Sequence, residues 1–465
     1  MGKTSKPIKH LTGIVIGAGI RGTDAYAPYL LKHPNEGKIV AVAEPNDRRR
    51  VAFCKKYAIS PENEYKDYQD LLSKPKLADF AIITTQDQMH VEPAILAMEK
   101  GYDVLLEKPM ALTEADCRKL VAVSEKTGCL LQICHVLRYS PFFQKIKEIV
   151  DSGALGKIVT IQHSENVSHY HYAHSFCRGN WRNQSQSSPM ILAKSCHDLD
   201  ILYWLANSDP VKITSLARPT ELCEKNKPEG APKFCIEGCP HSSICQYDAV
   251  ATYKKLLPIL LDFELSTRHR GLRWIFRQAR KRPWVLYLIT FGLARKVWPW
   301  RGFPVSVITT DTSDEGIDLA LRTTNYGKCV YQVGDNDQVS SQTVNILFAN
   351  GVNASFTMHS TSYREGREIR IDGTKGSIHG WFYQFDQYMR IIDHKTGRNK
   401  WIDMPLFFGP HGGGDQKLFA GFLAAVRGDE KPITTAKESL QSHLMAFAAD
   451  KAQREGIVID YSRYI

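Results

Sequence analysis

Short apolar runs alternate with helix-like segments through the first third of the chain. The runs at 14–16, 40–43, 78–84, 103–106 and 130–134 are rich in aliphatic residues, and each is followed by a glycine or a polar residue. The segments between them mix apolar with charged positions, as the surface helices of α/β proteins do. Regular alternation of this kind predicts a doubly wound parallel sheet with helices on both faces, closing near residue 135.

The first apolar run leads directly into a glycine-rich turn, Gly17-x-Gly19-x-x-Gly22. A strand, a tight glycine turn and the free N–H groups of a helix N-terminus form the pyrophosphate site of dinucleotide-binding folds. An acidic residue follows at the end of the second run, where Glu44 lies 22 residues beyond Gly22. We therefore expect a bound dinucleotide here, the alternative being a glycine turn without a ligand.

Glu44 also bears on the choice of dinucleotide. A carboxylate at this position binds the ribose hydroxyls and repels the 2′-phosphate of NADP, which favours NAD. The arginines at 48–50 could instead meet a phosphate, so NADP is kept as the second choice. Thr84 and Thr85 come at the carboxyl end of the third run, the edge at which doubly wound sheets bind ligands.

Length and cysteine usage fit a large protein of a reducing compartment. A chain of 465 residues exceeds what one hydrophobic core usually holds, so two domains are expected. The first ten residues lack the apolar stretch of a signal peptide, and no apolar run is long enough to span a bilayer. Eleven cysteines, an odd number over a long chain, argue against a disulfide framework. A cytoplasmic protein is the expectation.

The net charge of +11 comes almost entirely from one stretch. Residues 265–310 contain no Asp or Glu, ten Arg or Lys and four of the eight tryptophans. We expect an insertion at about 263–303, with helices over 271–282 and 283–296. The first helix carries three arginines on one face: Arg273, Arg277 and Arg280. Such a face could contact an anionic membrane surface, or pair with carboxylates of a second subunit; nothing else in the chain suits nucleic acid.

Several motifs occur along the chain in one order. They are GAGIRG (17–22), ITTQDQMH (83–90), LLEKPMALT (105–113), SGALGKIV (152–159), His197-x-x-Asp200 and GTKGSIHG (373–380). Taken together they resemble the Gfo/Idh/MocA oxidoreductases. The resemblance implies an NAD-binding Rossmann domain over 1–135 and an α/β domain over 136–465 with a large open, mostly antiparallel sheet. It also implies a sugar-like small-molecule substrate and a homo-oligomer.

The resemblance further implies that Lys108 and His197 are catalytic. Lys108 belongs to a Glu-Lys-Pro motif, in which the lysine can bond the reacting hydroxyl and the peptide before the proline is often cis. His197 is a candidate general base, and Asp200, one helical turn on, could share its face. One position departs from the family, because Ala193 stands where an Asp four residues before His197 is usual. Lys194 follows, and could bind an anionic group or replace the missing polar contact.

Without the resemblance, Lys108 would be read as a surface lysine and His197 as a core histidine on an apolar helix. The residues expected at the dinucleotide are Gly17, Gly19, Ile20, Arg21, Gly22, Glu44, Thr84, Thr85, His90, Glu107 and Lys108. Aromatic, amide and guanidinium groups gathered in one loop suit a polyhydroxylated ligand, although a polar loop without a ligand is the alternative. The residues expected at the substrate are Arg138, Tyr139, His171, Arg178, Asn180, Trp181 and Lys194.

A second loop, over 223–245, is rich in Pro, Gly and Lys and holds four cysteines. They are Cys223, Cys235, Cys239 and Cys245, and His241 could substitute for one of them. Four thiols in a loop without a core are typical of a metal site, with structural zinc ahead of an iron–sulfur cluster. Their spacing is not that of a standard zinc knuckle, so free thiols are the alternative.

These features predict an NAD-dependent oxidoreductase that transfers a hydride between nicotinamide and a hydroxyl of a sugar, polyol or glycoside. Some relatives oxidise a sugar only transiently, eliminate the aglycone and return the hydride, so an NAD-dependent glycoside hydrolase is the second hypothesis. A non-enzymatic NAD-sensing regulator is the third, and it is the less favoured because Lys108 and His197-x-x-Asp200 are both kept.

Overall fold

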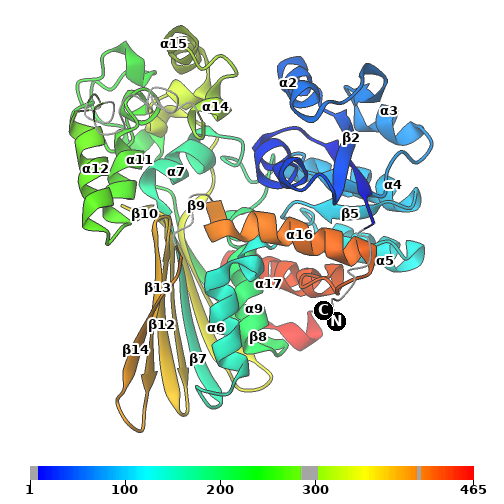
Figure 1. Ribbon diagram of the computed structural model, residues 1–465. Coiled ribbons are helices and arrows are strands. Elements are labelled where there is room, and N and C mark those ends of the chain that lie inside the picture. Colours follow the sequence, from blue (N-terminus) through cyan, green and yellow to red (C-terminus); the bar gives the residue numbers. More distant parts are fainter. Residues whose placement is uncertain (1–8, 283, 285–287, 289–301, 406–409, 465) are drawn as a thin grey trace. The chain divides into compact units, whose positions relative to one another are not determined.

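The chain forms two compact units, each of which is built from separated stretches of sequence. The computed structural model describes residues 9–282, 284, 288, 302–405 and 410–464 (Figure 1). The first unit comprises Met1–Lys145, Leu199–Tyr203 and Pro410–Phe447, and the second comprises Ile146–Asp198, Trp204–Gly409 and Ala448–Ile465. The chain therefore returns to its first unit near the C-terminal end, which the sequence reading did not include.

The first unit contains a six-stranded sheet in the order β3-β2-β1-β4-β5-β6, with every pair of neighbours parallel. Its strands are β1 (Leu11–Ile16), β2 (Gly37–Ala43), β3 (Glu64–Tyr65), β4 (Phe80–Ile83), β5 (Asp103–Leu106) and β6 (Leu131–Ile133). The order reverses beside β1, as it does in doubly wound sheets. The predicted Rossmann sheet is confirmed.

Helices complete the first unit. They are α1 (Pro28–Lys32), α2 (Asp47–Tyr57), α3 (Tyr68–Ser73), α4 (Val91–Glu99), α5 (Glu114–Thr127) and α16 (Gly414–Arg427). Helix α16 comes from the C-terminal return and packs into the same core as β1 and β4. The Phe80 ring of β4 meets the rings of Phe419 and Phe422 edge-on, at centroid distances of 6.0 and 5.6 Å. The core of this unit is therefore closed by residues from the far end of the chain.

The helix after the glycine turn is wound more loosely than the sequence suggests. Arg21–Tyr26 forms a π-helix, which continues into α1. Pro28 has no N–H group, so it cannot donate to the carbonyl four residues before it. The preceding amide instead closes a wider turn, since Ala27 N donates to Gly22 O at 3.4 Å. The turn of π-helix thus lies directly behind the glycine-rich loop.

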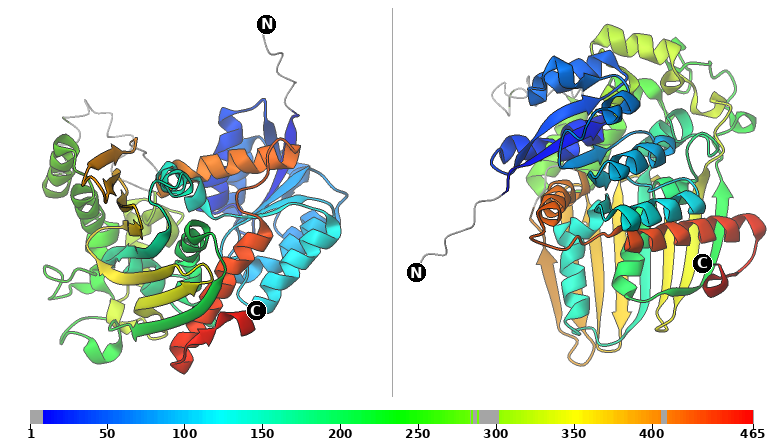
Figure 2. Two further views of the ribbon diagram at one scale, coloured as in Figure 1. Left: turned by 90° about the horizontal axis from the view of Figure 1, so that it is seen from below. Right: turned by 90° about the vertical axis from the view of Figure 1, so that its right-hand side faces the viewer.

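The second unit contains a nine-stranded sheet in the order β14-β13-β12-β11-β7-β10-β9-β8-β15. Only β7 and β10 run parallel, and all other neighbours are antiparallel. Its strands are β7 (Ile158–Ser168), β8 (Pro210–Pro219), β9 (Val339–Phe348), β10 (Asn353–Ser362), β11 (Gly366–Gly373), β12 (Gly376–Tyr383), β13 (Asp386–Asp393), β14 (Asn399–Asp403) and β15 (Ile459–Asp460). Figure 2 shows these long strands side by side. The predicted large, mostly antiparallel sheet is confirmed.

The remaining helices belong to the second unit or contain residues of both units. In the second unit they are α7 (His169–Tyr172), α8 (Met190–Ala193), α10 (Ala249–Tyr253), α11 (Leu257–Leu265), α12 (Arg270–Lys281), α14 (Val305–Ile308) and α15 (Asp314–Thr323). Helices α6 (Pro141–Asp151), α9 (Cys196–Ala206) and α17 (Ala436–Glu455) each contribute to both units. Among the described residues, no helix combines the length and the apolar character that crossing a bilayer requires.

The basic insertion begins as a helical hairpin in which α11 supplies the counter-charge for α12. Glu264 accepts from Arg277 at 2.7 Å and from Arg280 at 3.0 Å. Arg273 donates to the carbonyl of Thr267 at 2.8 Å. The three arginines predicted to share a face are thus bonded within their own chain. The second predicted helix, over 283–296, lies almost wholly outside the described residues.

Candidate active site

The glycine-rich turn is packed tightly against the end of β4. Gly17 has a φ of +95°, and a Cβ there would lie 2.7 Å from the carbonyl oxygen of Thr84. A Cβ on Gly22 would lie 2.5 Å from the carbonyl oxygen of Gly17. The Thr84 hydroxyl donates to that same carbonyl at 2.6 Å. Only glycine fits these two positions, and Thr84 fixes the turn that is expected to receive the pyrophosphate.

Glu44 lies buried at the end of β2, beside the same turn. One carboxylate oxygen accepts from the backbone N–H of Ala18 at 2.8 Å, and the other accepts from that of Asn46 at 3.0 Å. Of the neighbouring arginines, Arg50 is buried and donates to Glu64 at 2.8 Å and to the Glu44 carbonyl at 2.7 Å. Arg50 is therefore not available to a 2′-phosphate, which supports the preference for NAD.

Arg21 of the glycine motif joins a cluster of charged groups inside the first unit. Its guanidinium pairs with Glu107 and with Asp415, the latter at 2.7 Å. The Tyr26 hydroxyl donates to Glu107 at 2.6 Å. Burial opposes the charge on Glu107, but Arg21 and Lys108 outweigh it and hold the pKa of this carboxyl below its usual value. Sequence reasoning missed Asp415, because it lies 394 residues from its partner.

Lys108 follows β5 and is partly exposed, and its peptide bond to Pro109 is cis, as the motif indicates. Its backbone N–H donates to the Glu107 side chain at 2.9 Å. The ring of His90 lies between two neighbouring carbonyls, with Nδ1 2.7 Å from Pro109 O and Nε2 3.3 Å from Thr85 O. His90 thus links the ends of β4 and β5 beneath Lys108, rather than presenting a free ring to the dinucleotide.

Arg138 and Asp200, expected at the substrate and among the catalytic residues, bind each other. Arg138 Nε and Nη2 each lie 2.7 Å from an oxygen of Asp200, and both side chains are almost fully buried. The hydroxyl of Tyr139 is also buried and accepts from Gln132 at 3.1 Å. The Arg138 guanidinium is bound by the Asp200 carboxylate in the interior of the first unit. We therefore interpret the Arg138–Asp200 pair as an interaction that stabilises this unit.

The polar centre of the second unit is a network of buried charges at the ends of β7 and β11. Lys194, at the end of α8, lies 3.1 Å from Glu165 and 3.0 Å from Glu365. Arg367 pairs with Glu165 and also with Asp198, at 2.7 Å from the latter. The ammonium of Lys194 is therefore paired with two carboxylates of the network.

The charges and the burial of this network shift the pKa values of its three carboxyl groups in different directions. Burial raises the pKa of Glu165, although Arg367 and Lys194 oppose the shift. Burial also opposes the charge on Asp198, but Arg367 and His163 outweigh it, and the pKa of Asp198 falls to about 2. Glu365 behaves similarly, because His171 and Lys194 bring its pKa well below the usual value despite its burial. Two firmly ionised carboxylates thus stand beside one that holds its proton more readily.

Of the other residues expected at the substrate, His171 lies on α7 and Asn180 and Trp181 lie in the turn that follows, whereas His197, expected to be catalytic, lies on α9. His171 is partly exposed and its Nδ1 lies 2.9 Å from Glu365. Asn180 is exposed and Trp181 is partly exposed. His197 is buried near the start of α9. Nothing in the sequence around His171 indicated Glu365, which is 194 residues away.

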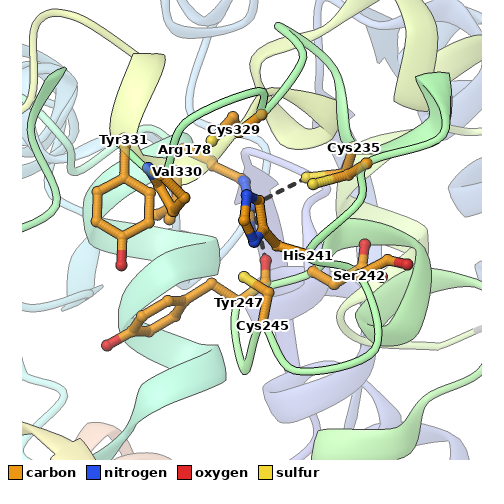
Figure 3. Close-up of a pocket in the computed structure, with 13 residues that line it drawn as sticks. Arg178, Cys235, His241, Ser242, Cys245, Tyr247, Cys329, Val330 and Tyr331 are labelled. Atoms are coloured by element: carbon orange, nitrogen blue, oxygen red, sulfur yellow. Dashed lines mark hydrogen bonds between the residues drawn. The ribbon is translucent and has the colours of Figure 1, made fainter. Parts of the chain in front are cut away.

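Arg178 is turned away from this loop and into a pocket of the cysteine-rich segment (Figure 3). Its guanidinium donates to the carbonyls of Lys328 and Tyr247 at 2.9 and 2.8 Å, and lies 3.8 Å from the sulfur of Cys235. The pocket is lined by Cys235, Cys239, Cys245 and Cys329, and Figure 3 shows the Arg178 side chain reaching toward Cys235. The structure thus gives Arg178 a role in holding the cysteine-rich loop.

The predicted metal site in this loop is not supported by the structure. In the part of the chain that the structure describes, no three His, Cys, Asp or Glu side chains are placed to hold a metal ion. Cys223, one of the four predicted ligands, does not line the pocket, and Cys329 takes its place. Burial raises the pKa values of Cys245 and Cys329.

Models of one oxidoreductase family match most of the chain. The model of its NAD-binding Rossmann fold matches residues 12–135. The GFO/IDH/MocA C-terminal domain matches residues 143–227, and the family's C-terminal alpha/beta domain matches residues 324–460. The residues from 228 to 323, which include most of the cysteine-rich loop and the basic insertion, lie between these matches.

Curated relatives match a smaller part. Inositol 2-dehydrogenase of Salmonella typhimurium is 30% identical over 196 residues, which are 42% of this chain and 54% of that protein. 1,5-Anhydro-D-fructose reductase of Ensifer adhaerens is 24% identical over 196 residues, 42% of this chain and 56% of that protein. The chain thus spans about half the length of the curated relatives it matches.

Solved structures share the fold over nearly the whole length. An oxidoreductase from Agrobacterium radiobacter, crystallised with NAD+, L-tartaric acid and magnesium, superimposes with a TM-score of 0.64 at 14% identity. The similarity covers 98% of this chain and 99% of that one. With its Rossmann sheet, its large antiparallel sheet and the family models in agreement, the chain belongs to the Gfo/Idh/MocA oxidoreductase family, and its first unit carries that family's NAD-binding Rossmann domain.

Proposed function

We propose that the protein is an NAD-dependent oxidoreductase that acts on a hydroxyl group of a sugar or polyol. The observation that carries this proposal is the glycine turn, in which Gly17 and Gly22 admit no side chain and Glu44 lies at the end of the next strand. Relatives named as an inositol dehydrogenase and an anhydrofructose reductase both act on polyhydroxylated rings, as their names state. The exposed Asn180 and partly exposed Trp181 suit such a ring, by hydrogen bonding and by stacking.

In this reaction the hydroxyl loses a proton and its carbon gives a hydride to nicotinamide, so that a carbonyl and NADH form. We assign Lys108 to the reacting hydroxyl, where an ammonium favours the developing negative charge on oxygen. His197 is assigned as a second polar group at the same hydroxyl, in accordance with its family motif. The Glu107 side chain accepts from the backbone N–H of Lys108 and holds that backbone in place.

The test is turnover with NAD across a panel of polyols and sugars that includes myo-inositol, followed by NADH absorbance. Accumulation of NADH in proportion to oxidised product supports the proposal. Release of an aglycone from a glycoside without net NADH would assign the protein to transient oxidation instead. Binding of NAD without turnover of any compound would make it a sensor.

We expect NAD to bind more tightly than NADP, and Glu44→Ala to narrow that preference. The reason is repulsion between the Glu44 carboxylate and a 2′-phosphate, together with the engagement of Arg50 by Glu64. Calorimetric titration of both dinucleotides into wild type and variant measures the two ratios. Glu62→Ala, which removes an exposed carboxylate from the same unit, is the control. Tighter binding of NADP by the wild type would contradict the assignment of Glu44.

A further inference from the structure

The first turn of α16 is bonded to the π-helix that follows the glycine-rich turn. Oδ1 of Asp415 lies 2.7 Å from Nη2 of Arg21, and the side chain of Gln416 donates to the carbonyl of Ala25. Arg21 begins the π-helix Arg21–Tyr26 and Ala25 is its last residue but one, so these two bonds hold both of its ends. Helix α16, orange in Figure 1, shares a core with the N-terminal sheet. The segment next to the expected pyrophosphate site is therefore held by residues near the C-terminal end.

Helix α16 is itself fixed where it meets the π-helix. A Cβ on Gly414 would lie 2.3 Å from the carbonyl oxygen of Val136, so the helix begins in close contact with the segment after β6. One turn further on, the ring of Phe419 lies in the core, 6.4 Å from the ring of Tyr26. A close-packed helix of this kind does not shift without disturbing its neighbours. The carboxylate of Asp415 is thus a fixed point inside the first unit.

The carboxyl group of Asp415 is buried and ionised. Its second oxygen lies 3.1 Å from Nδ1 of His411. Burial opposes the charge on Asp415, but Arg21 and His411 outweigh it and hold the pKa of this carboxyl well below its usual value. A buried charge is costly without its partner, so the ion pair persists and fixes the direction of the Arg21 side chain.

Arg21 connects this ion pair to the backbone of the glycine turn. It immediately precedes Gly22, so its main chain belongs to the turn. Its Nε pairs with one oxygen of Glu107, and the other oxygen of Glu107 accepts from the backbone N–H of Lys108 at 2.9 Å. The guanidinium thus bonds two carboxylates, one from the end of β5 and one from α16. Loss of either carboxylate frees the guanidinium to rotate, and with it the backbone of the turn.

We propose that Asp415 is a positioning residue for the dinucleotide, which acts through Arg21 to hold the glycine turn in the form that binds the pyrophosphate. The inference rests on the proposed function, in which NAD is the ligand of this turn. Asp415 acts through the arginine and is assigned no contact with the dinucleotide. Because coupling between two sites is reciprocal, bound NAD should in turn hold α16 more firmly.

The first experiment is calorimetric titration of NAD into the full-length protein. Asp415→Asn keeps the shape of the side chain but removes its charge, and should weaken NAD binding about 5–150-fold. Arg21→Gln should weaken it to a similar extent. In the Arg21→Gln background, Asp415→Asn should change the dissociation constant by no more than about twofold, because the group through which it acts is already lost. Two losses that multiply would overturn the route through Arg21.

Asp429→Asn is the matched control. It removes the same charge from an exposed carboxylate just beyond α16, which pairs with Arg427 at 3.0 Å, and should leave NAD binding unchanged. Arg21→Lys is the second variant if Asp415→Asn fails to fold, since an ammonium keeps the charge but lacks the fork that reaches both carboxylates. It should weaken NAD binding as Asp415→Asn does. A variant that is less stable in urea, yet binds NAD within about twofold of wild type, would overturn the proposal.

Hydrogen exchange tests the reciprocal effect. Saturating NAD should slow amide exchange over Gly414–Arg427 in the wild type, and should slow it less in Asp415→Asn at equal saturation. Exchange in α16 that is the same with and without NAD in the wild type would overturn the proposal.

Failure of the wild type to bind NAD would instead be a failure of the proposed function. The hold of α16 on the turn is then tested without a dinucleotide. Faster exchange over residues 17–26 in Asp415→Asn than in the wild type supports it, and equal exchange there would overturn it.

Discussion

Lys108→Ala is expected to lower kcat by about 10²–10⁴-fold while NAD binds as tightly as before. In the wild type, the Lys108 ammonium is expected to stabilise the negative charge that develops on the substrate oxygen, so its loss slows turnover. The pyrophosphate is expected to be bound by the backbone of the glycine turn, so NAD binding does not depend on this ammonium. Stopped-flow measurement of NADH formation gives the rate, and calorimetry gives the dissociation constant of NAD. His197→Ala should show the same separation of turnover from binding.

Lys100→Ala is the control for this experiment. Lys100 is exposed, and its ammonium donates to the carbonyl of Lys74 at 2.9 Å. This contact does not involve the glycine turn. Its removal should change neither constant. Should Lys108→Ala keep a rate within a few-fold of wild type, the lysine of the Glu-Lys-Pro motif would have no part in the chemistry of this protein.

Asp200→Ala is expected to destabilise the first unit by about 3–5 kcal/mol, because it removes the buried carboxylate that bonds two nitrogens of Arg138 and leaves the half-exposed Glu438, at 3.4 Å, as its counter-charge. Both nitrogens of the guanidinium that face Asp200 lie 2.7 Å from its oxygens. Urea unfolding of the variant, with the fluorescence transition compared with wild type, measures the difference.

Two further variants separate charge burial from loss of packing. Asp200→Leu combined with Arg138→Met should recover much of the lost stability, since two apolar side chains leave no buried charge. Asp151→Ala removes an exposed carboxylate that pairs with Lys147 at 2.7 Å, and should cost no more than about 1 kcal/mol. An Asp200→Ala variant as stable as Asp151→Ala would show that the pair contributes little, and would reopen a role for Asp200 at the substrate.

Local sequence predicted those parts of the fold in which neighbours along the chain are also neighbours in space. The strand that ends at Ile16, the glycine turn and Glu44 all lie within one βαβ unit, so their spacing alone indicates the dinucleotide site. The order of later motifs added the second sheet. What could not be read were partners across long separations, such as Asp415 for Arg21 and Glu365 for His171.

Residue type misled where one chemistry serves two purposes. Arg138 and Arg178 suit a sugar as readily as they suit an interior, and only burial distinguishes the two. Four cysteines close in sequence suggested a metal, yet the pocket takes its fourth thiol from Cys329, 84 residues beyond Cys245. The spacing of cysteines within one loop cannot predict a pocket residue that comes from another segment of the chain.

Because α16 belongs to the first unit, that unit is expected to complete its folding only after the C-terminal part of the chain has been synthesised. Phe419 and Phe422 are the aromatic residues that close the core against Phe80. They are synthesised some 270 residues after Lys145. At about 5–20 residues per second, the nascent nucleotide-binding sheet waits for about 15–55 s with its apolar face incomplete. Stalled chains that end before Pro410 should therefore be cut by protease in the first 145 residues, whereas released full-length chains should resist. For this fold, the segment made first is among the last to become native.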